Sequence, residues 1–415
     1  MSKILRQKQI STYQSWDWQI VLGIVSLFIS ILIGYLLTQS KGVVGIIWVL
    51  SIFAGFTLQK SRLCFASAFR DIFLFGSAQN LKGILLGLFI STIAFSFVMH
   101  WIIPNPGLGS IPSDAHILKT GLSTIIGGVL FGIGMVIAGG CVSGSLYRIG
   151  EGYVASFVTI VGVVIGLGLL SLTWNWWWDN LISSEETIWL PAINGIGYSG
   201  SIVITSLLLL IVLLGCIFTE TKSGQVNFSI QKSDSQLISF RDRTKDIFNK
   251  FFSREWPIYV GASVLGITSM FMFMVSHPFG VTGEVFRWSN GLMKLVDISV
   301  PVHKGLESLS GCVANASENS GIITISSAMT IGVIPGSFTA ALLSKEFKIR
   351  FPKEIKRYIQ SIIGGIMMGY AAGLAIGCTV GSFFSSIPSL SLSGWVFGGS
   401  LAVGAFFGVQ VIKKI

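Results

Sequence analysis

Three of the five cysteines lie where an apolar run gives way to glycine, serine or a charged residue. They are Cys64 in "RLCFASAFRD", Cys141 in "AGGCVSGS" and Cys378 in "AIGCTVGS". At such points a membrane helix is expected to break beside a pore through the membrane. A thiol donates a weak S–H hydrogen bond and accepts one, and it is the softest neutral group that can meet a sulfur or selenium atom. These three cysteines are therefore candidate substrate contacts.

The other two cysteines give weaker signals. Cys216 lies inside an apolar run, where a thiol packs as a small hydrophobic group. Cys312 lies in the loop-like "LSGCVANAS"; packing is the favoured interpretation, and its role stays open. The chain has no CxxC motif and no Cys/His pair at metal-ligand spacing, so the sequence predicts no zinc, iron–sulfur or thioredoxin-like site and no cofactor.

Glycine and serine surround Cys141 and Cys378 in the same pattern, Gly-Cys-x-x-Gly-Ser. Small residues four apart allow membrane helices to pack closely, which explains glycines such as Gly128 and Gly132. It does not explain the two cysteine motifs, where missing side chains would expose backbone N–H groups that attract anions. The predicted substrate path therefore includes six more residues: Gly140, Gly144, Ser145, Gly377, Gly381 and Ser382.

Charged residues at membrane depth are costly and suggest function. Arg70 precedes Asp71 in the Cys64 segment, and Glu284 and Arg287 lie in "GEVFRW". One interpretation is an internal ion pair that holds a re-entrant element in place. The other is that Arg70 and Arg287 place positive potential at the mouths of an anion path. His277, before a proline, is interpreted as a helix-end residue and not as a ligand.

The elements that position these residues are apolar. The chain has 415 residues, of which 52% are hydrophobic and 11% charged, against about 25% charged in soluble domains. Spanning a bilayer takes roughly 20 residues of helix, and the sequence predicts an all-α polytopic membrane protein whose first run is an anchor and not a signal peptide. About ten long apolar runs occupy 20–37, 43–58, 83–103, 121–140, 153–173, 200–218, 257–276, 321–343, 359–377 and 391–412.

The net charge is +10, and the basic residues cluster in the loops between these runs. Residues 219–256 carry seven basic residues and residues 344–357 carry six, whereas the tryptophan-rich stretch 174–200 has none. The positive-inside rule accounts for this distribution, so nucleic-acid binding is not needed to explain it. We expect both basic segments and both termini in the cytoplasm, and residues 174–200 outside with their indoles at headgroup level.

An internal repeat organises the chain. Residues 127–145 align without a gap to residues 364–382, and eight of the nineteen positions are identical, including Cys141/Cys378. The polar segment 219–256 then separates a first membrane repeat (1–218) from a second (257–415). With the topology above, the two copies cross the membrane in opposite directions. Inverted-topology repeats with interrupted helices are a recurrent plan of membrane transporters.

A second, weaker similarity lies upstream of each copy of the repeat. Residues 61–73 can be laid beside residues 279–291 with Phe69-Arg70 matched to Phe286-Arg287, a register in which Cys64 faces Val281. Both segments are too short and polar to span the bilayer. They are predicted to be half-helices or re-entrant turns, which are tolerated at membrane depth where protein or water satisfies the backbone.

At these residues the sequence resembles the YeeE/YedE sulfur-transport family of bacterial inner-membrane proteins. The resemblance rests on "SRLCFASAFRDIFLFG", "IIGGVLFGIGMVIAGGCVSGSLYRIGEG", "VTGEVFRWSNGLM", "GSFTAALLSKEFKIR" and "IIGGIMMGYAAGLAIGCTVGSFF". It implies thiosulfate uptake through an hourglass of inverted repeats. The family's three path-lining cysteines fall on Cys64, Cys141 and Cys378. It also implies a small cytosolic sulfurtransferase-like partner, and "VTGEVFRW" with "GSFTAALL" is similar to a branch associated with selenium.

Three functions are compatible with this pattern. A transporter of thiosulfate or a related sulfur or selenium anion explains the duplicated cysteines. A membrane-embedded thiol sulfurtransferase needs an activated thiolate and a base or resolving thiol, a constellation that the sequence lacks. A purely structural membrane subunit leaves the duplicated cysteines unexplained. The sequence therefore favours the transporter, which is not an enzyme.

Overall fold

Most of the structure is helical. The computed structural model describes residues 18–108, 110–193, 195–223, 255–312 and 323–414. The first half contains α2 (Trp18–Lys41), α3 (Val43–Lys60), α4 (Phe65–Phe75), α5 (Gln79–Ile102), α6 (Leu122–Ala138), α7 (Val142–Gly150), α8 (Val154–Asn180) and α9 (Gly197–Ser223). The second half contains α11 (Ile258–Val275), α12 (Thr282–Leu295), α13 (Ile325–Ile331), α14 (Val333–Leu343), α15 (Ile355–Leu374), the π-helix η6 (Thr379–Ser385) and α16 (Leu392–Lys414).

The remaining elements are short. Strand β1 (Lys119–Thr120) pairs antiparallel with β2 (Glu186–Thr187). Single 3-10 turns are η1 (Pro106–Leu108), η2 (Ile182–Ser184), η3 (Leu190–Ala192) and η4 (Leu306–Ser308). Within the described ranges, nine helices are long and apolar enough to cross a membrane, or ten if the bent pair of α15 and η6 counts as one span. The all-α polytopic class is therefore confirmed.

Each apolar run predicted from the sequence contains a helix, and the run 321–343 is divided into α13 and α14 next to Gly332. The two segments predicted to be too short to span form α4 and α12, helices of 11 and 14 residues. Helix α9 continues to Ser223, past the expected repeat boundary at 218. Most of the expected linker, residues 224–254, lies outside the described residues.

The helices break at the three candidate cysteines. Cys64 precedes α4, Cys141 precedes α7 and Cys378 precedes η6, each in an extended backbone conformation. Helix α6 ends at Gly139, whose φ of 77° is left-handed and suits glycine. Helix α15 ends before Ile376, which also has a positive φ, of 59°, and the chain turns by 48° into η6.

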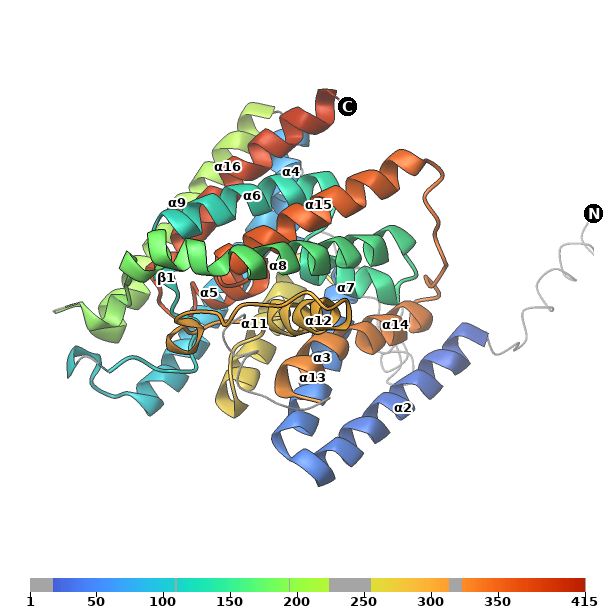
Figure 1. Cartoon of the computed structure of the whole chain (residues 1–415), viewed down its shortest axis with the longest axis horizontal. Helices are drawn as coiled ribbons and strands as arrows, with labels where there is room; N and C mark the ends of the chain where they lie inside the picture. The colour runs from blue at the N-terminus through green and yellow to red at the C-terminus, as the bar shows by residue number, and fades with distance from the viewer. Residues whose placement is uncertain (1–17, 109, 194, 224–254, 313–322, 415) are drawn as a thin grey trace, which may run out of the picture.

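The centre of the protein consists of α6, α8, α15 and α16, which are close enough to depend on glycine (Figure 1). A Cβ on Gly132 of α6 would lie 2.5 Å from the Leu401 carbonyl oxygen of α16. A Cβ on Gly369 of α15 would lie 2.2 Å from the Val163 carbonyl oxygen of α8. Gly132 and Gly369 are partners in the sequence repeat, so equivalent positions make equivalent contacts. The inverted orientation of the two copies stays a prediction.

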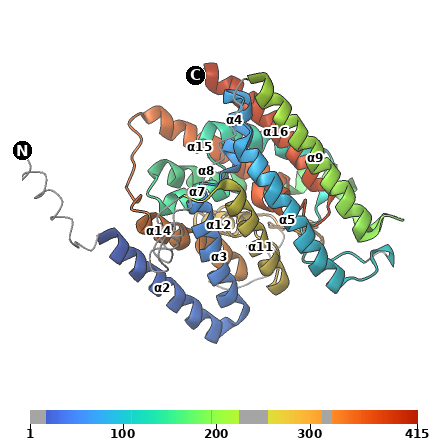
Figure 2. The same ribbon diagram turned by 180° about the vertical axis from the view of Figure 1, so that it is seen from behind.

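Two helices lie at opposite edges of this centre. Figures 1 and 2 show α2 and α9 on opposite sides in both views. In the most apolar 18 residues of each helix, only 17% are buried inside the protein. Such helices suit contact with lipid. In the tryptophan-rich stretch 174–200, Trp174 and Trp189 are buried, and their indole N–H groups donate to the Lys304 and Ser389 carbonyl oxygens. The expectation that the indoles of this stretch lie at headgroup level stays a prediction.

Candidate functional site

Cys64 and Cys141 begin two different helices and meet at one glycine. A Cβ on Gly144 would lie 3.2 Å from the Cys141 sulfur and 3.7 Å from the Cys64 sulfur. Both side chains are buried, and both are free thiols. Because Gly144 carries no side chain, no Cβ comes between its backbone and the two sulfur atoms.

The Cys141 thiol connects the two halves of the chain. Its sulfur accepts a hydrogen bond from the Gly144 N–H at 3.3 Å and lies 3.4 Å from the Ser143 hydroxyl oxygen. The Thr379 hydroxyl, from the second half, also faces this thiol. Thr379 directly follows Cys378, so the repeated cysteine segments approach each other here.

The Cys378 thiol lies among polar groups of the second half. The backbone N–H groups of Val281 and Gly381 and the Thr282 hydroxyl surround its sulfur. Cys378 is buried and is a free thiol. Cys64, Cys141 and Cys378 thus form a buried series, which we call the thiol column.

A large cavity opens at the Cys64 end of the thiol column. It has a volume of about 1070 Å³, and Cys64 and Tyr147 contribute to its lining. Five basic side chains and two acidic ones also line it, which favours anions. These charged residues are Arg62, Arg148, Lys345, Lys348, Arg350, Glu151 and Glu346. We call this space the basic cavity.

A second cavity lies where the segment before β1 meets η4. It has a volume of about 420 Å³ and is lined by polar residues such as Asp114, Lys119 and Glu307. Ile117 and Ser310 also line it, and the Ser310 hydroxyl donates to the Ile117 carbonyl oxygen. We call this space the polar cavity. It lies beside the tryptophan-rich segment, since Thr187 is part of its lining.

The predicted glycine and serine residues have different surroundings. Gly140 and Ser145 line a smaller cavity of about 260 Å³ together with Arg148 and Arg357. By contrast, Ser382 donates to the Ala375 carbonyl oxygen at 3.1 Å. A Cβ on Gly377 would strike the Ser382 hydroxyl oxygen at 2.4 Å, so this pair packs the turn between α15 and η6.

The two predicted arginines are both held by neighbouring carboxylates. Arg70 donates to Asp71 through Nε and Nη2 at 2.9 and 2.8 Å. Arg287 donates to Glu284 through Nε at 3.0 Å and Nη2 at 2.7 Å. Neither arginine belongs to the lining of the basic or polar cavity. These contacts agree with the first interpretation of the arginines, internal ion pairs.

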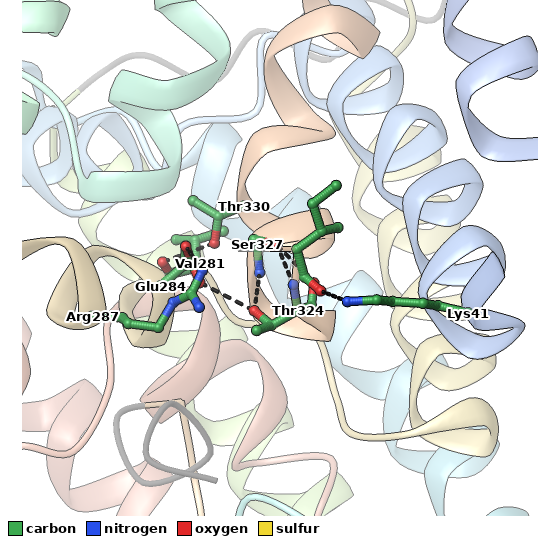
Figure 3. Close-up of polar contacts among 8 residues, drawn as sticks. Lys41, Val281, Glu284, Arg287, Thr324, Ser327 and Thr330 are labelled. Atoms are coloured by element: carbon green, nitrogen blue, oxygen red, sulfur yellow. Dashed lines mark hydrogen bonds and ion pairs between the residues drawn. The ribbon is translucent and has the colours of Figure 1, made fainter. Parts of the chain in front are cut away.

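Figure 3 shows how the Glu284 pair joins α12 to α13. Glu284 is buried, and the Thr324 hydroxyl donates to it at 3.3 Å. Thr324 is also the N-cap of α13, where it forms a capping box with Ser327. Thr330 of α13 donates to the Val281 carbonyl oxygen at 3.1 Å. The pair therefore holds the start of α12, and with it the segment that contacts Cys378.

Comparison with known proteins identifies the chain. Residues 60–407, most of its length, match the sequence profile of the family described as sulphur transport. The chain belongs to the sulphur transport family. This assignment confirms the resemblance seen in the sequence, and it makes the protein a transporter and not an enzyme.

Three relatives show how far the similarity extends along the chain. The thiosulfate transporter TsuA of Spirochaeta thermophila is 27% identical over 357 residues, which are 82% of this chain and 91% of that protein. The Escherichia coli TsuA is 24% identical over 346 residues, 82% and 87% of the two chains. The probable transporter YedE of Salmonella typhimurium is 34% identical over 163 residues, 39% and 37% of the two chains.

Sequence reasoning missed Arg148 as a site residue of this sulphur transport family member. Arg148 lies three residues after Ser145, in the last turn of α7, and it donates to the Gly139 carbonyl oxygen at 2.7 Å. A charged residue so close to a cysteine motif was a usable signal. The described residues contain no cluster of three or more metal-ligating side chains.

Proposed function

We propose that this protein takes up thiosulfate or a related small sulfur-containing anion across the inner membrane of a bacterium. The anion enters from the polar cavity, passes the thiol column and leaves through the basic cavity. The observation that carries this proposal is the meeting of the Cys64 and Cys141 thiols at Gly144, next to a cavity with excess positive charge. The two relatives named thiosulfate transporter support thiosulfate as the substrate.

Thiols suit successive weak binding of an anion. A neutral hydrogen bond contributes roughly 0.5–1.5 kcal/mol, which permits release, whereas an ammonium or guanidinium group would hold a dianion more firmly. The Cys141 sulfur already accepts a hydrogen bond from the Gly144 N–H and lies 3.4 Å from the Ser143 hydroxyl. In the proposal its S–H turns from this hydroxyl to the substrate. The thiols act as hydrogen-bond donors and are regenerated unchanged.

The distribution of charges supports the orientation of the path that we propose. The basic cavity is formed partly by residues 345–350, which belong to the basic segment that the positive-inside rule assigns to the cytoplasm. The polar cavity is lined by Lys119, but it also includes Thr187 of the stretch 174–200, which contains no lysine or arginine. With both termini in the cytoplasm, the thiol column leads from the polar cavity on the outside to the basic cavity on the cytoplasmic side. The basic cavity is also where a small cytosolic sulfurtransferase-like partner would receive the anion.

Growth of a bacterium that lacks sulfate uptake tests the proposal. The strain is supplied with thiosulfate as its sole sulfur source, with and without this gene. Growth that depends on the gene supports the proposal, and no growth at matched expression contradicts it. Uptake of selenite in the same strain, in excess of thiosulfate uptake, would assign the protein to selenium instead. A persulfide trapped on Cys64, Cys141 or Cys378 would favour a sulfurtransferase.

A further inference from the structure

Cys312 lies near Cys378 of the thiol column and two residues after Ser310, which lines the polar cavity. It is buried, and it is a free thiol. A Cβ on Gly280 would lie 2.0 Å from its sulfur, and a Cβ on Gly381 would lie 2.3 Å from it. The Cys312 thiol also faces Cys378 and the Thr282 hydroxyl.

The position of Cys312 matches that of Cys64 in the other half. Gly144 follows Cys141 by three residues, and its sequence partner Gly381 follows Cys378 by three. Cys64 faces Gly144 as Cys312 faces Gly381. The second half has Val281 where the first has Cys64, and the preceding residue, Gly280, is the one that Cys312 approaches. A different segment thus supplies the thiol that the sequence repeat lacks.

His116 also lies near Gly280 and Gly381, and one of its ring nitrogens makes no hydrogen bond to the described residues. A Cβ on Gly280 would lie 3.4 Å from His116 Cε1, and a Cβ on Gly381 would lie 3.8 Å from it. Nδ1 lies 3.2 Å from the Gly381 carbonyl oxygen, so Nδ1 carries the proton and donates it. Nε2, bonded to Cε1, is buried and has no hydrogen-bond partner among the described residues.

The imidazole is neutral in this environment. Burial, with a further contribution from the neighbouring His277, lowers the pKa of His116 to about 3. With Nδ1 protonated, Nε2 is a hydrogen-bond acceptor. Buried polar atoms are nearly always satisfied by protein or by ordered water, so an unpartnered acceptor beside a thiol points to a ligand or a water molecule that belongs there.

We propose that Cys312 and His116 form a fourth binding site for the transported anion, at the polar-cavity end of the thiol column. The inference rests on the proposed transport function and extends it. Cys312 donates its S–H to the anion, and Nε2 accepts a hydrogen bond from a water molecule that the anion keeps from its hydration shell. The site is the first buried contact on the way in, as Cys64 is the last on the way out.

Radiolabelled thiosulfate uptake in proteoliposomes tests the site. We expect Cys312→Ala to raise the KM by about 2- to 12-fold, the effect of losing one neutral hydrogen bond, and Cys312→Ser to retain most of the parent affinity. His116→Asn keeps an N–H near the Nδ1 position and removes Nε2, so a similar rise is expected. Cys216→Ala is the matched control. An unchanged KM in Cys312→Ala and His116→Asn would overturn the inference.

A labelling experiment on the unmodified chain covers the case in which these variants fail to fold. Thiosulfate is expected to slow alkylation of Cys312 by N-ethylmaleimide, measured by mass spectrometry, and to leave Cys216 labelling unchanged. Equal Cys312 labelling with and without thiosulfate contradicts the site. Labelling reports occupancy and not transport, so it decides the Cys312 site separately. A parent that takes up no thiosulfate would contradict the proposed function instead.

Discussion

The sulfur atoms of Cys64 and Cys141 lie on the same side of Gly144, within 3.7 and 3.2 Å of the position that a Cβ would occupy there. Gly144 lies in α7 and does not have a positive φ, so its backbone does not require glycine. The space itself is what the missing side chain provides. In the transport path proposed above, this position is where the anion would contact both thiols.

The first prediction is that Gly144→Ala lowers transport about tenfold while the protein still folds. The added methyl group would lie 3.2 and 3.7 Å from the two sulfur atoms, distances that folding tolerates. It would occupy the position at which the anion is proposed to contact both thiols. Overpacking costs about 1–3 kcal/mol, and a cost of about 1.4 kcal/mol in the occupied state lowers uptake tenfold. Thiosulfate uptake at matched expression measures the effect.

Gly215→Ala is the control for this change. Gly215 lies in α9, and a Cβ there would have no neighbour within 4 Å. Its uptake is expected to equal that of the parent. A Gly144→Ala protein that transports at the parent rate would show that the anion does not pass between Cys64 and Cys141.

The second prediction concerns the thiols themselves. Replacing Cys64, Cys141 or Cys378 by Ala removes one donor and should lower uptake by about 2- to 12-fold for each hydrogen bond lost. Folding should change little, because one small side chain is lost. Cys216, in α9 away from the column, should be replaceable without effect. Parent-level uptake by both Cys141→Ala and Cys378→Ala would identify these thiols as packing residues.

The sequence could predict the helix ends at the cysteines, because glycine and polar residues after an apolar run cannot continue a membrane helix unaided. It could also predict the repeat contacts, since Gly132 and Gly369 keep their identity. It could not predict Cys312, because Cys312 reaches Gly381 through tertiary packing and has no repeat partner. The sequence could not predict the basic cavity either, because its lining residues are far apart in the chain. From the sequence alone, basic residues such as Arg350 indicated only which loops lie in the cytoplasm.

The third prediction tests the central packing through one helix, α16. A Cβ on Gly404 would lie 2.1 Å from the Val129 carbonyl oxygen of α6, whereas a Cβ on Gly399 would have no neighbour within 4 Å. We expect Gly404→Ala to destabilise the protein by about 1–3 kcal/mol and Gly399→Ala to leave it unchanged. Thermal unfolding in detergent compares the two identical changes. Equal melting temperatures would contradict the close contact of α6 with α16.

The fourth prediction separates the two interpretations of Arg287. If the pair with Glu284 is structural, Arg287→Gln leaves a buried carboxylate without its cation and destabilises the protein by about 3–5 kcal/mol. Glu284→Gln combined with Arg287→Gln removes both charges and should be less harmful than Arg287→Gln alone. Thermal stability and uptake are measured for all three proteins. A stable Arg287→Gln protein with a raised KM would instead place Arg287 at the mouth of the anion path.

The last prediction is a pH dependence of anion binding in the basic cavity. Burial raises the pKa of the Glu151 carboxyl group above its usual value of 4.5, and nearby Glu346 adds to the shift, although Arg148 and Arg350 oppose it. Below the raised pKa, Glu151 is neutral and the cavity is more positive by one charge. As the pH rises through that pKa, the carboxylate forms and opposes the anion. The Kd of the purified protein for thiosulfate should therefore increase over this range, and Glu151→Gln should bind with a Kd that stays flat and close to the low-pH value of the parent. If the parent and Glu151→Gln show the same pH profile, Glu151 does not set the charge that the anion meets.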